Sequence, residues 1–286
     1  MSPTVALEST VIAHGLPAPA NLETARRLES IVRDEGAAPR TVGIVNGTEM
    51  VGLSDAQLRR LATAEDVRKV SLRDLPVVTA GSADGATTVA ATMHLAHRAG
   101  IAVMATGGIG GVHRGADGAP TADVSADLEA LRRLPMIVVC SGPKMVLALD
   151  ATRERLESDG VTVVGYQTDT MPAFYSRSSG RPVDVRCDTP DAVAEVAAAR
   201  DRLDLPAAVL VTVPPPEDVA LPRSELAPVL EQALAETDRK GLQSDAVTPF
   251  LLRRLRAEGG DRVVTANRAL LRRNARVAAR IAAAVH

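Results

Sequence analysis

The alternation of short β-branched runs with longer segments of helical periodicity limits most strongly how this chain can fold. Apolar runs of strand length recur along the first three quarters of the sequence, at Val5–Ile12, Thr41–Val45, Val77–Ala80, Ile101–Thr106, Met136–Cys140, Val161–Gly165 and Ala207–Val213. Most are separated by segments with apolar residues at i, i+3 and i+4, as at Leu28, Ile31 and Val32. This pattern predicts an α/β fold, layered α/β/α, with a largely parallel central sheet.

The sequence offers no clear boundary between domains. A chain of 286 residues can form one large α/β domain or two small ones. No linker rich in Pro, Gly or Ser divides it, and the three prolines at 214–216 form only a short, late stretch. From Arg223 to His286 the pattern predicts three helices and no strand. We therefore predict a single domain over residues 1–286, with a helical C-terminal region packed on it or on a neighbouring subunit.

Charge and composition argue against nucleic-acid and membrane partners. The 33 Lys and Arg residues nearly balance 35 Asp and Glu residues, for a net charge of −2, whereas nucleic-acid-binding domains carry a basic surplus. Aromatic residues make up 1% of the chain, too few for a base-stacking platform. No apolar run approaches the roughly 18–20 residues of a membrane span, and no signal-peptide pattern opens the sequence. With only Cys140 and Cys187 as thiols, we predict a cytoplasmic protein.

Glu8 is the first candidate for a functional residue, because it interrupts an otherwise apolar run. Burying an unpaired carboxylate costs several kcal/mol, so Glu8 needs a partner, a raised pKa or a cleft. His14 follows closely and could bring an imidazole to the same end of the sheet. A salt-bridged glutamate at a strand end explains Glu8 equally well, and a lone histidine in a turn is more often structural.

Five glycines lie within nine residues directly after the run Ile101–Thr106, in Gly107–Gly115. Glycines after a strand let backbone N–H groups approach an anion closely, and His113 and Arg114 could add positive charge. The spacing does not match the dinucleotide fingerprint, and no Gly-Lys-Ser/Thr follows as in a P-loop. We interpret the segment as an anion- or ligand-binding loop rather than a merely flexible turn.

Two acids flank a serine in the segment Asp123-Val124-Ser125-Ala126-Asp127. Ser125 is predicted to cap a helix that runs through Leu131. Asp123 and Asp127 could offer oxygen ligands to Mg²⁺ or Mn²⁺, which take one or two carboxylates together with waters and substrate oxygens. On spacing alone, capping is the stronger explanation.

Lys144 follows the run Met136–Cys140 after a Ser-Gly-Pro turn, and we expect a helix to begin there. A lysine at a helix N-terminus faces the positive end of the dipole, which lowers its pKa. A lowered pKa yields the neutral amine that carbonyl chemistry needs. An ordinary surface lysine fits the same pattern, and Lys69 taken alone is also a surface charge.

Taken together, these segments resemble the pseudouridine-5′-phosphate glycosidase family, also called indigoidine synthase A-like. The matching segments run in family order from about Val5 to Ala284, and include ALEST-VIAHGLPAPAN, KVSLRDLP, GATTVAATM, ATGGIGGVHRGA, DVSADL, VGYQTD-MPAFY and VTPFLL. The resemblance implies reversible cleavage of the C–C glycosidic bond of pseudouridine 5′-phosphate to uracil and ribose 5-phosphate. It also implies an α/β/α fold and a homotrimer.

The resemblance assigns chemical roles to particular residues. Ordinary glycosidases use two carboxylates to cleave an O- or N-glycosidic bond. In this substrate a carbon of the base is joined to the sugar, so the sugar must accept the electrons of the bond that breaks. The resemblance implies that a lysine Schiff base with ring-opened ribose is this electron acceptor. The family's nucleophile falls on Lys144, its acid on Glu8, and its metal-binding aspartate, usually with Mn²⁺, on Asp123. Substrate-binding positions fall on Lys69, Val89, Ser125, Ala126 and Asp127, and His113 and Asn267 also match the family pattern.

The chain departs from the family pattern in two loops. The usual Gly-Lys-Asn-Gly appears as Ser82-Ala83-Asp84-Gly85, and the segment between Gly115 and Asp123 looks about two residues longer. Two further hypotheses stay open beside the glycosidase. One is a Schiff-base aldolase or lyase that acts on another sugar phosphate through Lys144, and the other is a sugar-phosphate-binding homo-oligomer without catalysis.

Overall fold

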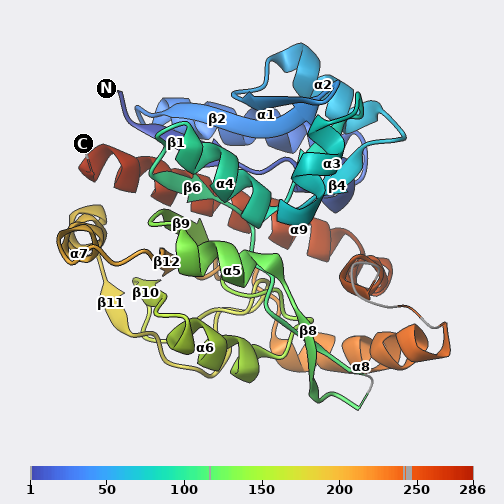
Figure 1. Ribbon diagram of the computed structural model, residues 1–286. Helices are drawn as coiled ribbons and strands as arrows, with labels where there is room; N and C mark the ends of the chain where they lie inside the picture. Colours follow the sequence, from blue (N-terminus) through green and yellow to red (C-terminus); the bar gives the residue numbers. More distant parts are fainter. Residues whose placement is uncertain (1, 116, 241, 243–246, 286) are drawn as a thin grey trace.

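The computed structural model describes residues 2–115, 117–240, 242 and 247–285. Its main element is a ten-stranded sheet made of β1 (Thr4–Leu7), β2 (Ala38–Val45), β3 (Thr48–Val51), β4 (Arg68–Val70), β5 (Gly85–Thr87), β6 (Val103–Ala105), β9 (Ile137–Cys140), β10 (Thr162–Tyr166), β11 (Val185–Cys187) and β12 (Val209–Thr212). The order is β11-β10-β12-β9-β6-β1-β2-β5-β4, with β3 paired to β2. Neighbours from β11 to β2 are parallel, while β3 and β5 are antiparallel to β2. The prediction of a largely parallel sheet is confirmed (Figure 1).

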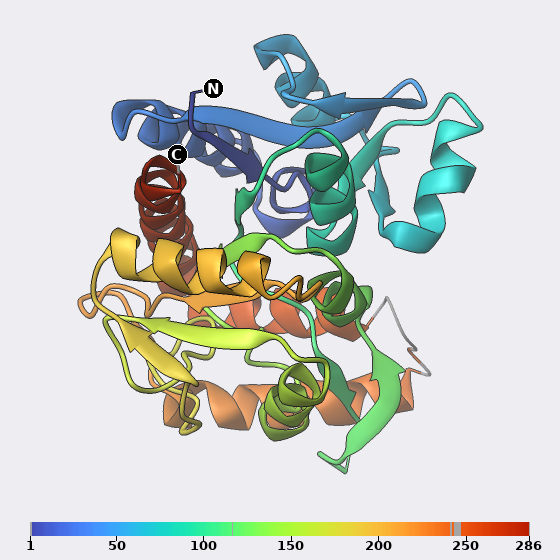
Figure 2. The same cartoon turned by 60° about the vertical axis from the view of Figure 1, so that its left-hand side comes forward.

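Helices cover both faces of this sheet. One layer contains α1 (Ala20–Asp34), α7 (Pro190–Arg202), α8 (Arg223–Arg239) and α9 (Val247–Ala284), and the other contains α4 (Val89–Arg98), α5 (Ala126–Arg133) and α6 (Leu149–Ser158). The helix α9 contacts β1, β6 and β9, and the other three helices of its layer pack beside it. In both views this C-terminal helix lies between the blue N-terminal part and the yellow-green middle part of the chain (Figures 1 and 2).

The strands at the centre of the sheet are buried on both faces. Val5 and Leu7 of β1 join the core that contains α9, whereas Ala6 between them joins the core of α4 and α5. All three are at most 4% exposed. Burial on both faces explains why these strands read as unbroken apolar runs rather than as alternating polar and apolar residues.

The register of the central strands brings the residues that directly follow them in the sequence to one edge of the sheet. Leu7 pairs with Ala105, and Ala105 pairs with Val139, so β1, β6 and β9 end at nearly the same level. Glu8 follows β1 and Thr106 follows β6 directly. The carboxyl ends of parallel strands are where α/β folds place their ligands.

Two of the predicted strands differ in the structure. The first ends at Leu7, and Ile12 lies in a π-helical turn, η1 (Val11–Gly15). Residues 77–80 belong mostly to a short helix, α3 (Leu75–Thr79), instead of a strand. Pro76 lies in the first turn of this helix, where proline is favourable. Val78 is buried, whereas Val77 is 59% exposed. One-sided burial is typical of a surface helix, so the β-branched composition of this run was misleading.

The smaller elements complete the fold. The helix α2 (Asp55–Thr63) follows β3, the 3₁₀ turn η2 (Leu72–Asp74) follows β4, and β7 (Val112–Arg114) forms an antiparallel hairpin with β8 (Pro120–Val124). This green hairpin projects from the body in both views (Figures 1 and 2).

The C-terminal region is helical, as predicted. Gly260 has φ 56° and ψ −142°, outside the helical region, so α9 bends there into two segments and, with α8, gives the three predicted helices. The helix α9 packs on the sheet of its own chain, and α8 packs on α9. Within the described residues, no helix combines the length and apolarity needed to cross a membrane.

Candidate active site

A cavity of about 740 Å³ opens at the carboxyl ends of the central strands. On one side it is lined by β4, η2 and the first turn of α4, and on the other by the β7–β8 hairpin and the first turn of α5. Nine of the ten predicted site residues line it: Glu8, Lys69, Val89, His113, Asp123, Ser125, Ala126, Asp127 and Lys144. The tenth, Asn267, lies half-buried on α9 outside this lining, and its role stays a prediction.

Glu8 lies at the inner end of the cavity, directly after β1. The Thr106 hydroxyl, at the end of the neighbouring β6, donates a hydrogen bond to Glu8 Oε1. Burial is the main cause that raises the pKa of the Glu8 carboxyl, and the nearby Asp127 carboxylate acts in the same direction. The Lys144 and Lys69 amines and the Thr106 hydroxyl lower this pKa by less. Glu8 therefore holds its proton more readily than an exposed glutamate, as a proton donor must.

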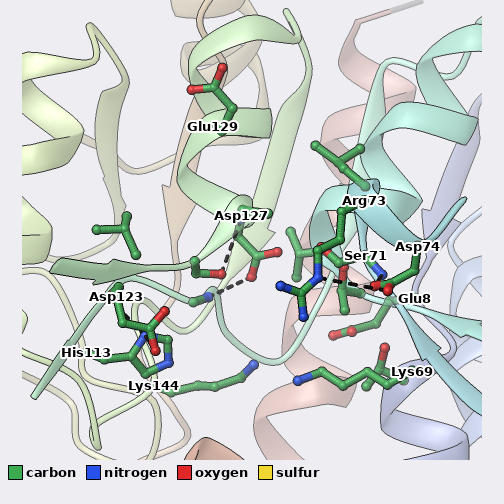
Figure 3. Close-up of a pocket in the computed structure, with 18 of the residues that line it drawn as sticks. Glu8, Lys69, Ser71, Arg73, Asp74, His113, Asp123, Asp127, Glu129 and Lys144 are labelled. Carbon is green, nitrogen blue, oxygen red and sulfur yellow. Dashed lines mark hydrogen bonds and ion pairs between the residues drawn. The ribbon is translucent and has the colours of Figure 1, made fainter. Parts of the chain in front are cut away.

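Lys144 enters the cavity from the turn that follows β9. Figure 3 shows its amine pointing toward that of Lys69, which comes from the opposite side on β4. The expected helix at Lys144 is wrong, because α6 begins only at Leu149. Instead the turn is fixed by the backbone: Lys144 N donates to Ile109 O at 3.0 Å. The position of Lys144 is thus set by the glycine-rich loop and not by a helix dipole.

The glycine-rich loop packs closely against neighbouring side chains. A Cβ on Gly110 would lie 2.1 Å from Ser125 Oγ, and one on Gly108 would lie 2.6 Å from the Phe174 ring. The Gly110 amide donates to Asp127 Oδ2 at 2.8 Å, so this N–H is already used inside the protein. Of the five glycines, only Gly110 lines the cavity. The interpretation as an anion- or ligand-binding loop stays a prediction, and the segment reaches the cavity at Gly110 and His113. Glycine is needed at positions 108 and 110 because neighbouring side chains approach the backbone too closely for any Cβ.

Asp127 and Ser125 shape the cavity wall through backbone contacts. Ser125 Oγ accepts from Asp127 N and caps α5, which confirms the predicted cap. The Asp127 side chain is buried, with Oδ1 accepting from Ala90 N at 3.0 Å and Oδ2 from Gly110 N at 2.8 Å. Both carboxylate oxygens are thus used to join the start of α4 to the glycine-rich loop, which makes Asp127 a poor metal ligand.

Asp123 and His113 face each other across the hairpin. His113 Nδ1 lies 3.1 Å from the Asp123 carbonyl oxygen and 3.4 Å from its Oδ2, and the Asp123 side chain is 37% exposed. No cluster of three or more His, Cys, Asp or Glu among the described residues could hold a metal ion. One open carboxylate fits Mg²⁺ or Mn²⁺, which keep several waters, and does not fit an ion enclosed by protein ligands.

The opposite wall is rich in positive charge. Arg68, Lys69 and Arg73 line the cavity there, and a capping box in which Ser71 N donates to Asp74 Oδ2 at 2.9 Å holds the turn that carries Arg73. His14 lies beside this wall, hydrogen-bonded to the backbone of residues 67 and 68, but does not line the cavity. Guanidinium and ammonium groups together suit a phosphate.

The altered loop at residues 82–85 lies away from the cavity. The Asp84 carboxylate accepts from Arg60 Nε at 2.6 Å and from Asn46 N at 2.9 Å. Its negative charge is therefore balanced locally at the turn between β2 and β3. The departure in this loop leaves the charge of the cavity unchanged.

Two residues that support the site were not identified from the sequence. Thr106 carried no signal of its own within the glycine-rich segment, although it bonds Glu8. Asn274 is 1% exposed on α9, and the only available signal was an amide within a helix that is otherwise apolar on its inner face. Both lie beneath the cavity and not in its wall.

Fold and site together define a class: an α/β enzyme in which a lysine and a proton-retaining glutamate face one small-molecule cavity with a cationic wall. The comparisons then identify the family. The chain belongs to the indigoidine synthase A-like family, whose sequence model matches residues 1–284.

Relatives and solved structures agree with this membership over nearly the whole chain. Proteins named pseudouridine-5′-phosphate glycosidase are 55% identical in Rhodospirillum centenum, with 99% of this chain and 87% of the relative covered, and 50% identical in Symbiobacterium thermophilum, with 99% and 92% covered. The crystal structure of an indigoidine synthase A-like protein from Thermotoga maritima superposes with a TM-score of 0.91 at 36% identity, covering 98% of this chain and 92% of that one. The prealnumycin C-glycosynthase AlnA, solved with ribulose 5-phosphate, superposes with a TM-score of 0.90 at 40% identity, covering 99% and 91%.

Proposed function

We propose that this chain is a pseudouridine-5′-phosphate glycosidase, which reversibly cleaves the C–C bond between sugar and base to give uracil and ribose 5-phosphate. The observation that carries the proposal is the meeting of Glu8 and Lys144 in one cavity with Lys69. The names of relatives at 45–55% identity support the choice of substrate.

The proposed reaction uses Lys144 as nucleophile and Glu8 as acid. The Lys144 amine bonds to C1 of the sugar while the bond from C1 to the ring oxygen breaks, and Glu8 gives its proton to that oxygen. The ammonium formed in this step returns a proton to the Glu8 carboxylate, and the freed nitrogen lone pair then forms a C=N bond as the bond to uracil breaks. The bonding pair stays on the uracil carbon, which takes up the proton from Glu8, and addition of water to the C=N carbon releases ribose 5-phosphate and restores the amine.

The remaining cavity residues bind and orient. Lys69, with Arg68 and Arg73 on the same wall, is assigned to the phosphate because guanidinium and ammonium groups bind phosphate oxygens strongly. Asp123 is assigned to one Mn²⁺ per subunit, with His113 beside it, and the bound ion would supply positive charge near the substrate oxygens. Val89, Ser125, Ala126 and Asp127 shape the wall against which the base or sugar lies.

We also propose that the protein works as a homotrimer in the cytoplasm. The homotrimer rests on the family resemblance, and the cytoplasmic location rests on a sequence with only two cysteines, Cys140 and Cys187. Analytical ultracentrifugation of the purified chain tests the first.

A second candidate reaction is the formation of a C–C bond to an acceptor other than uracil. It is favoured by the similarity to AlnA, which is described as a C-glycosynthase in complex with ribulose 5-phosphate. An aldolase or lyase acting on another sugar phosphate would use the same lysine. A panel that contains pseudouridine 5′-phosphate, ribulose 5-phosphate and deoxyribose 5-phosphate separates these reactions.

The decisive experiment monitors uracil release from pseudouridine 5′-phosphate with Mn²⁺ and then locates the reacting lysine. The chain has only three lysines, Lys69, Lys144 and Lys240, so borohydride reduction with ribose 5-phosphate followed by mass spectrometry gives an unambiguous position. We expect the pentose phosphate on Lys144, no turnover in Lys144→Arg, and considerable turnover in Lys69→Arg. An adduct on Lys69 alone, or uracil release by Lys144→Arg, would disprove the assigned nucleophile.

A further inference from the structure

The helix α9 places one buried amide beneath the cavity. Asn274 is 1% exposed, and its neighbours on the inner face of the helix are apolar and equally buried, as at Leu270, Leu271 and Ala278. Burying an amide among such residues is unfavourable unless its hydrogen bonds are satisfied. The contacts of this side chain therefore indicate why a polar residue occupies the position.

Asn274 joins the ends of two adjacent strands. Its Nδ2 donates to Thr106 O at 2.8 Å, just after β6, and to Ser141 Oγ at 3.1 Å, just after β9. A longer contact of 3.4 Å reaches Gly107 O. The Ser141 hydroxyl in turn lies 3.3 Å from Asn274 Oδ1. One side chain thus fixes where both chain segments leave the sheet.

These two segments carry the two reacting groups of the proposed mechanism. Thr106 donates to Glu8, so the first contact of Asn274 continues to the acid. Ser141 opens the turn that leads to Lys144, so the second contact continues to the nucleophile.

We propose that Asn274 is a positioning residue that sets the placement of Glu8 relative to Lys144. This inference rests on the proposed function, because it uses the roles of these two residues. Small displacements matter at such a site, since a misplacement of about 1 Å can cost about 100-fold in rate. Asn274 itself does not line the cavity.

The test compares Asn274→Leu with a matched control, Asn21→Leu. Asn21 is also buried, and its Nδ2 also donates to two backbone carbonyls, Ile12 O at 3.0 Å and Ala62 O at 2.9 Å, but it does not line the cavity. We expect both variants to lose thermal stability. Only Asn274→Leu should lose kcat, by about 10- to 100-fold, with KM for pseudouridine 5′-phosphate changed less because the wall with Lys69 is untouched.

Two further readouts separate positioning from simple stabilisation. The hydrogen bond from the Thr106 hydroxyl lowers the pKa of Glu8, so weakening it should raise this pKa. Because Glu8 must be protonated to act as the acid, the basic limb of the pH–kcat profile should move to higher pH in Asn274→Leu and in Thr106→Val. Loosening the turn before Lys144 should slow borohydride trapping of ribose 5-phosphate in Asn274→Leu and in Ser141→Ala. Asn21→Leu should leave both readouts at the wild-type value.

The outcomes distinguish this inference from the proposed function. Wild-type protein without uracil release would refute the function before any variant is compared. Given an active wild type, an Asn274→Leu variant with wild-type kcat, pH limb and trapping rate would overturn the inference. If Asn274→Leu fails to fold, the variants Thr106→Val and Ser141→Ala test the inference in its place. An unchanged kcat, basic limb and trapping rate in both variants would then overturn the positioning role of Asn274.

Discussion

Replacing Glu8 with glutamine separates proton donation from the other contacts of this side chain. Glutamine has nearly the same size, and its carbonyl oxygen can still accept from the Thr106 hydroxyl, as Glu8 Oε1 does. It carries no carboxylic proton, so it cannot protonate the sugar ring oxygen. In the proposed reaction the Lys144 bond to C1 forms as that oxygen leaves, so ring opening is the step that should slow.

The expected loss is large and falls on the chemical step. General acid catalysis contributes about 10²–10⁴-fold, which corresponds to about 3–5 kcal/mol of activation free energy at 1.36 kcal/mol for each factor of ten. Substrate affinity should change far less, because Lys69 and the other cationic residues of the cavity wall stay in place.

The assay is single-turnover kinetics at saturating pseudouridine 5′-phosphate, with Glu129→Gln as the control. Glu129 also lines the cavity, but its carboxylate pairs with Arg132 and Arg133 on α5, so its substitution should leave the chemical rate close to wild type. A Glu8→Gln rate within a factor of a few of wild type would refute the reasoning, because another group would then supply the proton.

The same variant tests the raised pKa of Glu8 through stability. A carboxyl whose pKa is raised by folding binds its proton more tightly in the folded state, so its stabilising contribution is present at low pH and is lost as pH rises through the folded pKa. Glutamine imitates the protonated form at every pH. Glu8→Gln should therefore gain stability over wild type as pH rises above about 4, the ordinary range of a glutamate pKa, as measured by urea unfolding. A difference independent of pH would contradict the raised pKa.

Three further predictions concern the wall, the hairpin and the altered loop. Gly110→Ala would place Cβ 2.1 Å from Ser125 Oγ; overpacking of this kind costs about 1–3 kcal/mol, so the melting temperature and kcat should both fall, and wild-type values of both would contradict the packing argument. Asp123→Asn should weaken Mn²⁺ binding in isothermal titration, whereas Asp117→Asn on the exposed tip of the same hairpin should not; equal affinities in the two variants would exclude Asp123 as ligand. Asp84→Ala should lower stability but not kcat, because Asp84 bonds Arg60 outside the cavity; a large loss of kcat would place the loop in the site.

The sheet and the convergence of its strand ends could be predicted from the sequence because burial on both faces leaves a local signature. Val5–Leu7 and Val103–Ala105 lie in unbroken apolar runs, and the polar residues that follow such runs meet at one edge. A short hydrophobic run does not reveal by itself whether its burial is one-sided, which is why residues 77–80 proved to be mostly helical.

The details of the site depend on contacts between distant segments, which no local pattern contains. The close approach of Phe174 to Gly108 and of Ser125 to Gly110 decides that the glycines serve packing. In the same way, the backbone bond from Lys144 to Ile109 holds the lysine where a helix was expected. Tertiary packing overrode the preference read from each segment alone.

The distribution of lysine and arginine adds an independent argument about where amine chemistry takes place. The sequence has 33 basic residues, and subtracting its three lysines leaves 30 arginines. Arginine supplies a permanent charge and forked hydrogen bonds but cannot act as a nucleophile, whereas lysine can lose its proton and attack a carbon. In this arginine-rich chain two of the three lysines, Lys69 and Lys144, line one cavity, and Figure 3 shows their amines directed toward each other. The meeting of two amines in one cavity supports the proposed covalent role of Lys144, and the turn that Asn274 is proposed to hold leads to this lysine.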